Sequence, residues 1–298
     1  MINTLFKLSI FVISIALTAH AYADWIPFTL KNNHITIDIK FNGVDSTAML
    51  DSGSEINAVS PLFIDKYAGD DIKKAGTIRV KGVNAVMTRQ KYSNVPVTIF
   101  GVDVIMDNLT EVGLGGHAIL LGAPFFKNFI VQIDYPNTRL RVLPKKSVDL
   151  KKLKNVNIRR DKSSSLPAIE VTINDKDVWL ILDTGSNSGL LVKRNYAKSQ
   201  NWLTAETNTL EGMSRGVNAS SEIELFNIPS LKIGPYDLEN ILVTVPGEGE
   251  KITVGNRYRG IYRSTMSKQT HGLLGYEILK HFILTIDYSN YRAHIFAP

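Results

Sequence analysis

Alternating hydrophobic and polar positions predict short β-strands along much of the chain. Residues 35–41 read ITIDIKF and residues 169–173 read IEVTI, so every second position is apolar in both runs. Each run leads into a polar turn, at residues 42–43 and 174–175, and then into a second apolar run. A period of two on both sides of a short turn is typical of a β-hairpin. The pattern therefore predicts two equivalent hairpins.

The two hairpins belong to a longer internal repeat. Residues 35–53 align without a gap on residues 167–185, and residues 118–135 align on residues 271–288. The offset between the copies grows from 132 to 153, so the second copy carries 21 additional residues between its two blocks. Two β-rich copies joined by a polar stretch predict an all-β, bilobal protein. The predicted segments are a signal peptide at 1–23, an N-terminal lobe at 24–148, a basic linker at 149–165 and a C-terminal lobe at 166–298.

In each copy the second strand of the hairpin ends at an aspartate, Asp51 or Asp183. A carboxylate at the end of a buried strand is costly, because desolvation disfavours its charged form. A two-fold repeat brings equivalent residues near its axis, so we expect Asp51 and Asp183 to share one site. Two carboxyl groups that close together hold one proton between them, which suits general acid–base hydrolysis of an amide.

The residues that follow each aspartate fit this chemistry. A glycine allows the backbone to approach the carboxylate closely. The hydroxyl directly after each aspartate is expected to bond across the axis. The serine after the glycine is expected to donate to the carboxylate, which favours ionisation and moves the active pH range towards acid. The predicted supporting residues are Ser52, Gly53, Ser54, Thr184, Gly185 and Ser186.

A second motif completes the pattern in each copy. Leu120-Leu121-Gly122 follows the first acidic turn and Leu273-Leu274-Gly275 follows the second. With these motifs the chain resembles the retropepsin-like branch of the pepsin-type aspartic proteases, duplicated in a single chain. The resemblance covers both lobes and implies a pseudo-two-fold acid protease fold, an aspartic endopeptidase activity and a cleft between the lobes. It implies Asp51 and Asp183 as the catalytic pair.

The resemblance also implies a β-hairpin flap over the cleft. The candidate segments, residues 81–92 and 211–222, share a Gly-Val-Asn sequence. Neither tip carries the tyrosine that pepsins have there, which makes the flap the main departure from the family pattern. The candidate flap residues are Gly82, Val83, Asn84, Gly216, Val217 and Asn218.

The same residues allow other interpretations. A non-catalytic module that binds peptides of the cell envelope, or a dimer in which each lobe pairs with another chain, would use the same fold. Asp134 and Asp287 are expected to form turns rather than to catalyse. The six histidines show no metal-ligand spacing, and Ser186 lacks a nucleophile elbow. We expect no metal and no cofactor.

The N-terminus predicts export. Lys7 precedes an apolar run at residues 8–19, and Ala21-Tyr22-Ala23 has small residues where a signal peptidase requires them. The chain has no cysteine, which excludes disulfides and thiolate metal sites. We expect a periplasmic protein, with secretion or an uncleaved membrane anchor as alternatives, and no stable membrane span after cleavage.

The net charge of +6 is concentrated in residues 145–162, which contain eight lysines and arginines. Such a run is typical of a solvated linker, although contact with anionic lipid or an acidic substrate is an alternative. No aromatic residues alternate with the basic ones, so nucleic acid is not expected as a partner. The expected partner is a peptide or protein substrate, bound by a monomer whose two lobes form an intramolecular pseudo-dimer.

Overall fold

The computed structural model describes residues 24–81, 86–215, 220–250 and 267–298. The signal-peptide segment and the six candidate flap residues lie outside these ranges. The described residues form 23 strands in three sheets and five short helices, which confirms the all-β prediction. No helix within these ranges is long and apolar enough to span a bilayer.

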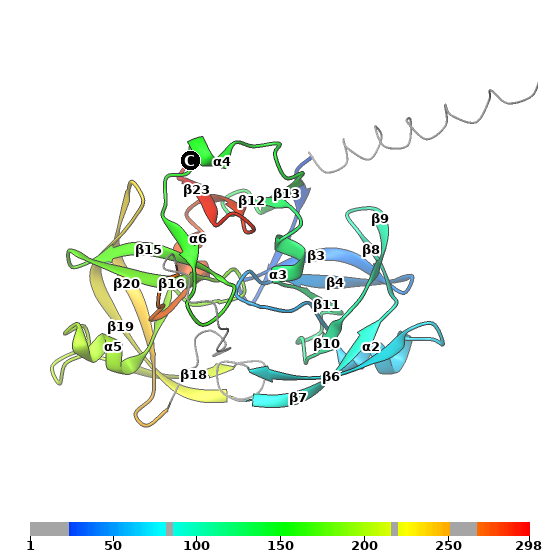
Figure 1. Ribbon diagram of the computed structural model, residues 1–298. Coiled ribbons are helices and arrows are strands. Elements are labelled where there is room, and N and C mark those ends of the chain that lie inside the picture. Colours follow the sequence, from blue (N-terminus) through cyan, green and yellow to red (C-terminus); the bar gives the residue numbers. More distant parts are fainter. Residues whose placement is uncertain (1–23, 82–85, 216–219, 251–266) are drawn as a thin grey trace, which may run out of the picture.

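The first repeat forms a ten-stranded sheet, here called lobe one (Figure 1). Its predicted hairpin is β3–β4, in which Ile37 pairs with Ala48. The path of the sheet is β6-β7-β10-β5-β11-β4-β3-β8-β9, with β2 paired to β3. The strands are β2 (Thr29–Lys31), β3 (His34–Phe41), β4 (Val44–Leu50), β5 (Ala58–Val59), β6 (Lys73–Lys81), β7 (Val86–Ser93), β8 (Val95–Ile99), β9 (Val102–Met106), β10 (Leu109–Glu111) and β11 (Ile119–Leu121).

The second repeat forms an eight-stranded sheet, here called lobe two, with the path β14-β15-β16-β21-β17-β20-β19-β18. The hairpin β15–β16 is the equivalent of β3–β4 and pairs Val171 with Val178. The long hairpin β19–β20 lies within residues 195–270, the region of the second copy in which the additional residues fall. The strands are β14 (Ile158–Arg160), β15 (Pro167–Ile173), β16 (Lys176–Leu182), β17 (Leu190–Val192), β18 (Leu210–Arg215), β19 (Ser220–Ile233), β20 (Tyr236–Pro246) and β21 (Gly272–Leu274).

Both repeats contribute to the third sheet, which has the order β1-β13-β12-β22-β23. Its central pair is symmetric, because Gln132 of β12 lies opposite Thr285, its own equivalent in β22. The Gln132 side-chain amide donates to the Thr285 hydroxyl at 2.7 Å. The pseudo-two-fold axis therefore passes between these two residues. The strands are β1 (Ile26–Pro27), β12 (Ile130–Asp134), β13 (Arg139–Leu143), β22 (Ile283–Asp287) and β23 (Arg292–Phe296).

One hydrophobic core extends through both lobes and the shared sheet. Its largest buried rings include Phe126 and Tyr288, which stack at a centroid distance of 5.9 Å although they come from different repeats. Short helices cap the sheets: α2 (Pro61–Tyr67), α3 (Ala123–Phe126), α4 (Leu150–Leu153), α5 (Arg194–Ser199) and α6 (Tyr276–Leu279). The β12–β22 pairing and the Phe126–Tyr288 stack join the two lobes.

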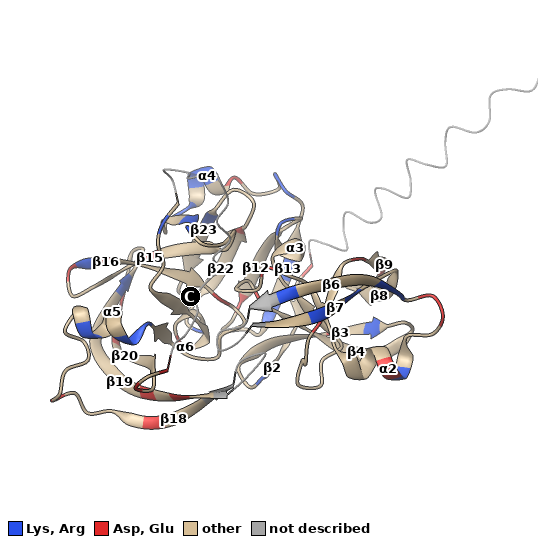
Figure 2. Ribbon diagram, turned by 60° about the horizontal axis from the view of Figure 1, so that its bottom comes forward, with Lys and Arg blue, Asp and Glu red and all other residues tan. Residues whose placement is uncertain are grey.

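The segment 149–165, predicted as a linker, contains regular structure. It includes α4, whose first turn is capped when the Asp149 carboxylate accepts the Lys151 N–H at 3.1 Å. It also includes β14, where Ile158 is buried against Ile169 of β15. The lysines around α4 remain exposed and give this end of the molecule its positive charge (Figure 2).

Candidate active site

The two aspartates lie at equivalent strand ends. Asp51 follows β4, and its N–H donates to the Leu121 carbonyl at 3.0 Å. Asp183 follows β16, and its N–H donates to the Leu274 carbonyl at the same distance. In each lobe the strand with the Leu-Leu motif runs parallel to the strand that delivers the aspartate. The motif therefore fixes the end of each strand and the position of the aspartate that follows it.

The residue after each aspartate bonds across the axis. The Ser52 N–H donates to the Thr184 hydroxyl at 2.9 Å, and the Thr184 N–H donates to the Ser52 hydroxyl at 3.0 Å. Each hydroxyl then donates to a carbonyl of the opposite lobe, Ser52 to Leu182 at 2.7 Å and Thr184 to Leu50 at 3.2 Å. All four groups are satisfied and both side chains are buried. This network locks the two acidic turns against each other.

The glycines allow the carboxyl groups to come together. A Cβ atom on Gly53 would overlap the carboxyl group of Asp183, and one on Gly185 would overlap that of Asp51. Each glycine N–H also donates to the carboxylate of its own lobe, at 2.9 Å in both cases. Only a residue without a side chain allows this approach.

The two carboxyl groups hydrogen-bond to each other. Desolvation raises the pKa of Asp51 well above its usual value of 3.8, and the charge and hydrogen bond of Asp183 raise it further. Desolvation also raises the pKa of Asp183, while the hydrogen bond from Asp51, the Gly185 N–H and the charge of His34 act to lower it. One proton is therefore shared between the two carboxyl groups.

The predicted role of Ser54 and Ser186 is wrong. The Ser54 hydroxyl donates to the Ile56 carbonyl at 2.9 Å, and the Ser186 hydroxyl lies 2.9 Å from that of Ser188. Both side chains thus bond within their own turn, two residues ahead, as serine commonly does. The backbone N–H of Ser54 and that of Ser186 act on the carboxylates instead and lower their pKa.

Sequence reasoning missed two tyrosines beside the pair. The Tyr288 hydroxyl donates to the Ser52 carbonyl at 3.3 Å, and burial raises the pKa of this phenol. Tyr135, its equivalent, is buried near Asp183, and desolvation raises its pKa as well. The available signal was the tyrosine of Ile-Asp-Tyr, which recurs in both copies.

Asp134 and Asp287 are placed away from the pair and bind turn residues. Asp134 accepts from Asn137 and Arg139, and Asp287 accepts from Asn290. Across the described ranges, no three His, Asp or Glu side chains gather as metal ligands would.

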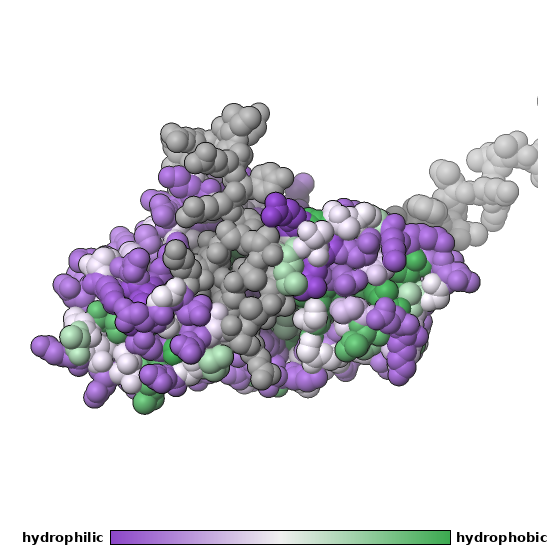
Figure 3. Space-filling view, turned by 90° about the horizontal axis from the view of Figure 1, so that it is seen from below, coloured by the Kyte–Doolittle hydropathy of each residue, from purple (hydrophilic) through white to green (hydrophobic). Residues whose placement is uncertain are grey.

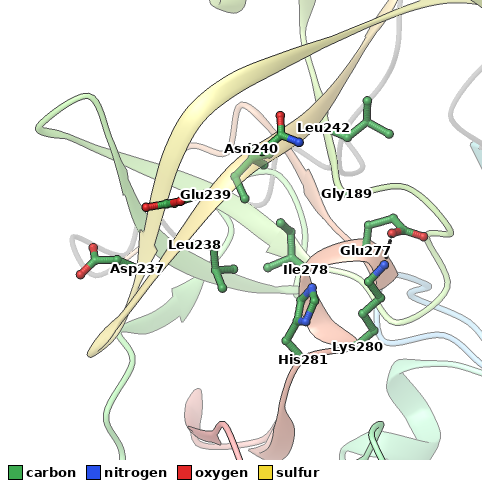
Figure 4. A pocket seen from close by; sticks show the side chains of 11 residues that line it. Gly189, Asp237, Leu238, Glu239, Asn240, Leu242, Glu277, Ile278, Lys280 and His281 are labelled. Atoms are coloured by element: carbon green, nitrogen blue, oxygen red, sulfur yellow. Dashed lines mark hydrogen bonds and ion pairs between the residues drawn. The ribbon is translucent and has the colours of Figure 1, made fainter.

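A pocket of about 500 Å³ lies elsewhere in lobe two, between β20 and α6 (Figure 4). Apolar side chains such as Leu238 and Ile278 line it together with charged ones from both elements. One of these, Glu277, accepts from Lys280 and from Asn33 of lobe one, so the wall of the pocket is tied to the β2–β3 turn.

Comparison with known proteins follows the same division into repeats. Residues 169–278 match the family described as aspartyl protease, so the match covers the second copy. The structure is similar to that of the aspartic proteinase from Irpex lacteus, with a TM-score of 0.51 and 12% sequence identity over 92% of this chain and 97% of that one. The resemblance to aspartic proteases is confirmed. The fold is the bilobal, pepsin-like one that the repeat predicted.

The match of residues 169–278 to the aspartyl protease family supports aspartic protease activity in general. A search of curated proteins gives no match to this chain.

Proposed function

We propose that this protein is an aspartic endopeptidase in which Asp51 and Asp183 together activate a water molecule. One observation carries the proposal: the two carboxyl groups, one from each repeat, lie together at the axis, each in the space that a side chain on the turn glycine of the other lobe would occupy. Two facing carboxyl groups with one proton can act as acid and base in the same step. The glycines and the cross-axis network support this role, because they hold the pair at that separation.

In the proposed mechanism Asp51 carries the shared proton at the start and Asp183 is ionised. Asp183, the ionised member, takes a proton from water while the water oxygen bonds to the carbonyl carbon of the substrate. Asp51 gives its proton to the carbonyl oxygen, so a neutral tetrahedral diol forms. The diol then collapses: the amide nitrogen receives a proton from Asp183, the C–N bond breaks, and Asp51 recovers its proton from a hydroxyl of the diol. The pair returns to its starting state and two peptide fragments leave.

The exposed apolar side chains of the hairpins on one face support a peptide substrate. Ile78, Met87, Leu210 and Met213 lie on β6, β7 and β18, and each is at least 36% exposed. These strands form the underside of the molecule in Figure 1, which Figure 3 views directly. A monomer is the proposed active form, because both halves of the pair come from one chain and the shared sheet joins them.

The test is hydrolysis of a diverse peptide library between pH 3 and 7 by the chain from Asp24 onwards. Asp51→Asn and Asp183→Asn should each abolish cleavage, since each removes half of one acid–base device. Asp38→Asn is the matched control, because Asp38 is exposed on the neighbouring strand β3 and should leave the rate unchanged. Substantial activity in either dyad variant would remove that residue from the mechanism, and a folded wild-type protein that binds peptides without cutting them would favour a binding module.

We also propose that the chain is exported and works in the periplasm. The support is the apolar run at residues 8–19 and the cleavage pattern ending at Ala23, which lie outside the described residues. Cell fractionation with N-terminal sequencing should give a periplasmic protein that begins at Asp24. Full-length protein in the membrane fraction would instead indicate an uncleaved anchor.

A further inference from the structure

The two halves of the acidic pair have different neighbours. In lobe one the pairing of β3 and β4 ends at Thr36 and Met49, with His34 two residues before Thr36 and Asp51 two residues after Met49, and the charge of His34 acts on Asp183. In lobe two the equivalent of His34 is Leu166, two residues before Ala168, the last residue of β15 that pairs with β16. The repeat thus has an imidazole beside the pair on one side and a buried leucine on the other.

Two further basic side chains lie close to His34. Lys31 is the direct partner of His34 across the β2–β3 hairpin. Its ammonium nitrogen reaches back over the sheet to Gly116, where it lies 3.3 Å from the position of an added Cβ. His117, the next residue, is buried and its Nδ1 lies 2.9 Å from the Thr47 hydroxyl. Burial lowers the pKa of His117, and the charges of Lys31 and His34 lower it further, so all three groups lie within electrostatic reach of one another.

The charge of Lys31 is not balanced by the protein in the part of the chain that the structure describes. Lys31 is exposed there and makes no ion pair, and Glu277, the acid of lobe two that the β2–β3 turn contacts, is already paired with Lys280. Asn33, in the turn between Lys31 and His34, donates to Glu277 at 3.3 Å. This contact with lobe two fixes the hairpin, so the two basic groups are held in place next to the pair.

A small apolar cluster adjoins these basic groups. Met49 and Leu120 belong to a small cluster separate from the main core, with Ile56, Ala58, Val112 and Leu114. Thr36 and Met49 are opposed in the pairing and therefore share one face of the sheet, and His34, two residues from Thr36, projects to that same face. Met49 and Ile56, the two partly buried members of this cluster, offer a substrate on this face apolar contacts beside the basic groups.

We propose that Lys31 and His34 form a subsite that binds a carboxylate of the substrate near the bond to be cut. The proposal rests on the proposed function, because it assigns a preference to that same site. A carboxylate would accept from both groups and meet the uncompensated ammonium charge, which gives charge-assisted hydrogen bonds. The carboxylate can come from a Glu or Asp side chain or from the C-terminus of a short peptide.

The test compares peptides that differ only by Glu or Gln, with the change moved through the positions on either side of the cleaved bond. Peptides with a free or an amidated C-terminus test whether the bound carboxylate is that of the peptide C-terminus. We expect kcat/KM to favour the carboxylate by about tenfold or more at one position, as for a hydrogen bond to a charged group. Lys31→Gln should remove most of this preference. Lys31→Glu should reverse the preference, so that a peptide with Lys at that position is cut faster than one with Glu. Lys40→Gln, at the other end of β3, is the matched control.

Binding of the same peptides to Asp183→Asn, measured by fluorescence anisotropy, keeps the two proposals distinguishable. Tighter binding of the carboxylate peptide supports the subsite even where no peptide is cut. Equal binding and equal cleavage of the Glu and Gln peptides at every position, or no binding of either, would overturn it. Cleavage of the Gln peptide by the wild-type protein reports on the proposed function alone.

Discussion

The cross-axis network makes a quantitative prediction about stability. Thr184→Val replaces the hydroxyl by a methyl group of similar size, so little cavity forms and the lost hydrogen bonds dominate. Two buried backbone groups, the Ser52 N–H and the Leu50 carbonyl, then lose their partner. Each unsatisfied group costs about 1–3 kcal/mol, so the free energy of unfolding should fall by about 2–6 kcal/mol.

Urea unfolding followed by circular dichroism measures this change. Thr184→Ser keeps the hydroxyl and should lose only about 1 kcal/mol, the contribution of a buried methyl group. Thr172→Val is a second control, because the Thr172 hydroxyl bonds to Asp177 in an exposed position and its removal should cost less than about 1 kcal/mol. A loss below about 1 kcal/mol for Thr184→Val would show that the network does not hold the lobes together. The same variant should also reduce kcat, since the acidic turns would no longer be fixed.

Three further predictions concern the acidic turns. Gly53→Ala should reduce kcat at least about 100-fold because its Cβ would displace a carboxyl group, whereas Gly113→Ala, with open space around it, should have no effect. Ser54→Ala and Ser186→Ala should leave the alkaline limb of the pH–rate profile in place, because these hydroxyls bond elsewhere; a moved limb would contradict the observed geometry. The raised pKa of Asp51 stabilises the fold at low pH, and this contribution is lost as pH rises above 3.8 through the folded-state pKa. Asp51→Asn should therefore flatten the decline of stability towards alkaline pH, and an unchanged slope in urea unfolding would refute this.

The repeat allowed the pair itself to be predicted from sequence. Asp51 and Asp183 occupy the same place in two copies, and equivalent residues meet where they lie close to the axis that relates the copies. The hydroxyls of Ser52 and Thr184 were predicted to cross the axis for the same reason, and they do so. Symmetry thus supplies long-range information that local patterns cannot.

The details that depend on a competing local partner could not be predicted. The Ser54 hydroxyl had two acceptors within reach, and the Ile56 carbonyl, fixed by the turn, is the one it uses. The strand β14 lies in a charged stretch whose few apolar residues show no period of two, and Ile158 pairs there with Ile169 of β15. The placement of His34 near the pair depends on the register of β3 and β4. This register becomes clear only once the hairpin is known.

The shared sheet has a consequence for the order in which the molecule folds. Its first strand, β1, lies near the start of the described chain, and its last, β23, ends at Phe296. The pairing of β12 with β22 joins residues about 150 positions apart, and contacts of such separation form slowly because a long loop must close first. During synthesis the edge of β12 thus stays open until the final residues appear, and an open edge attracts other strands. Since β22 is the equivalent of β12, a second copy of β12 is its natural substitute. A chain that ends before residue 283 lacks β22, so its β12 should pair with β12 of a second copy. The truncated protein would then form a homodimer.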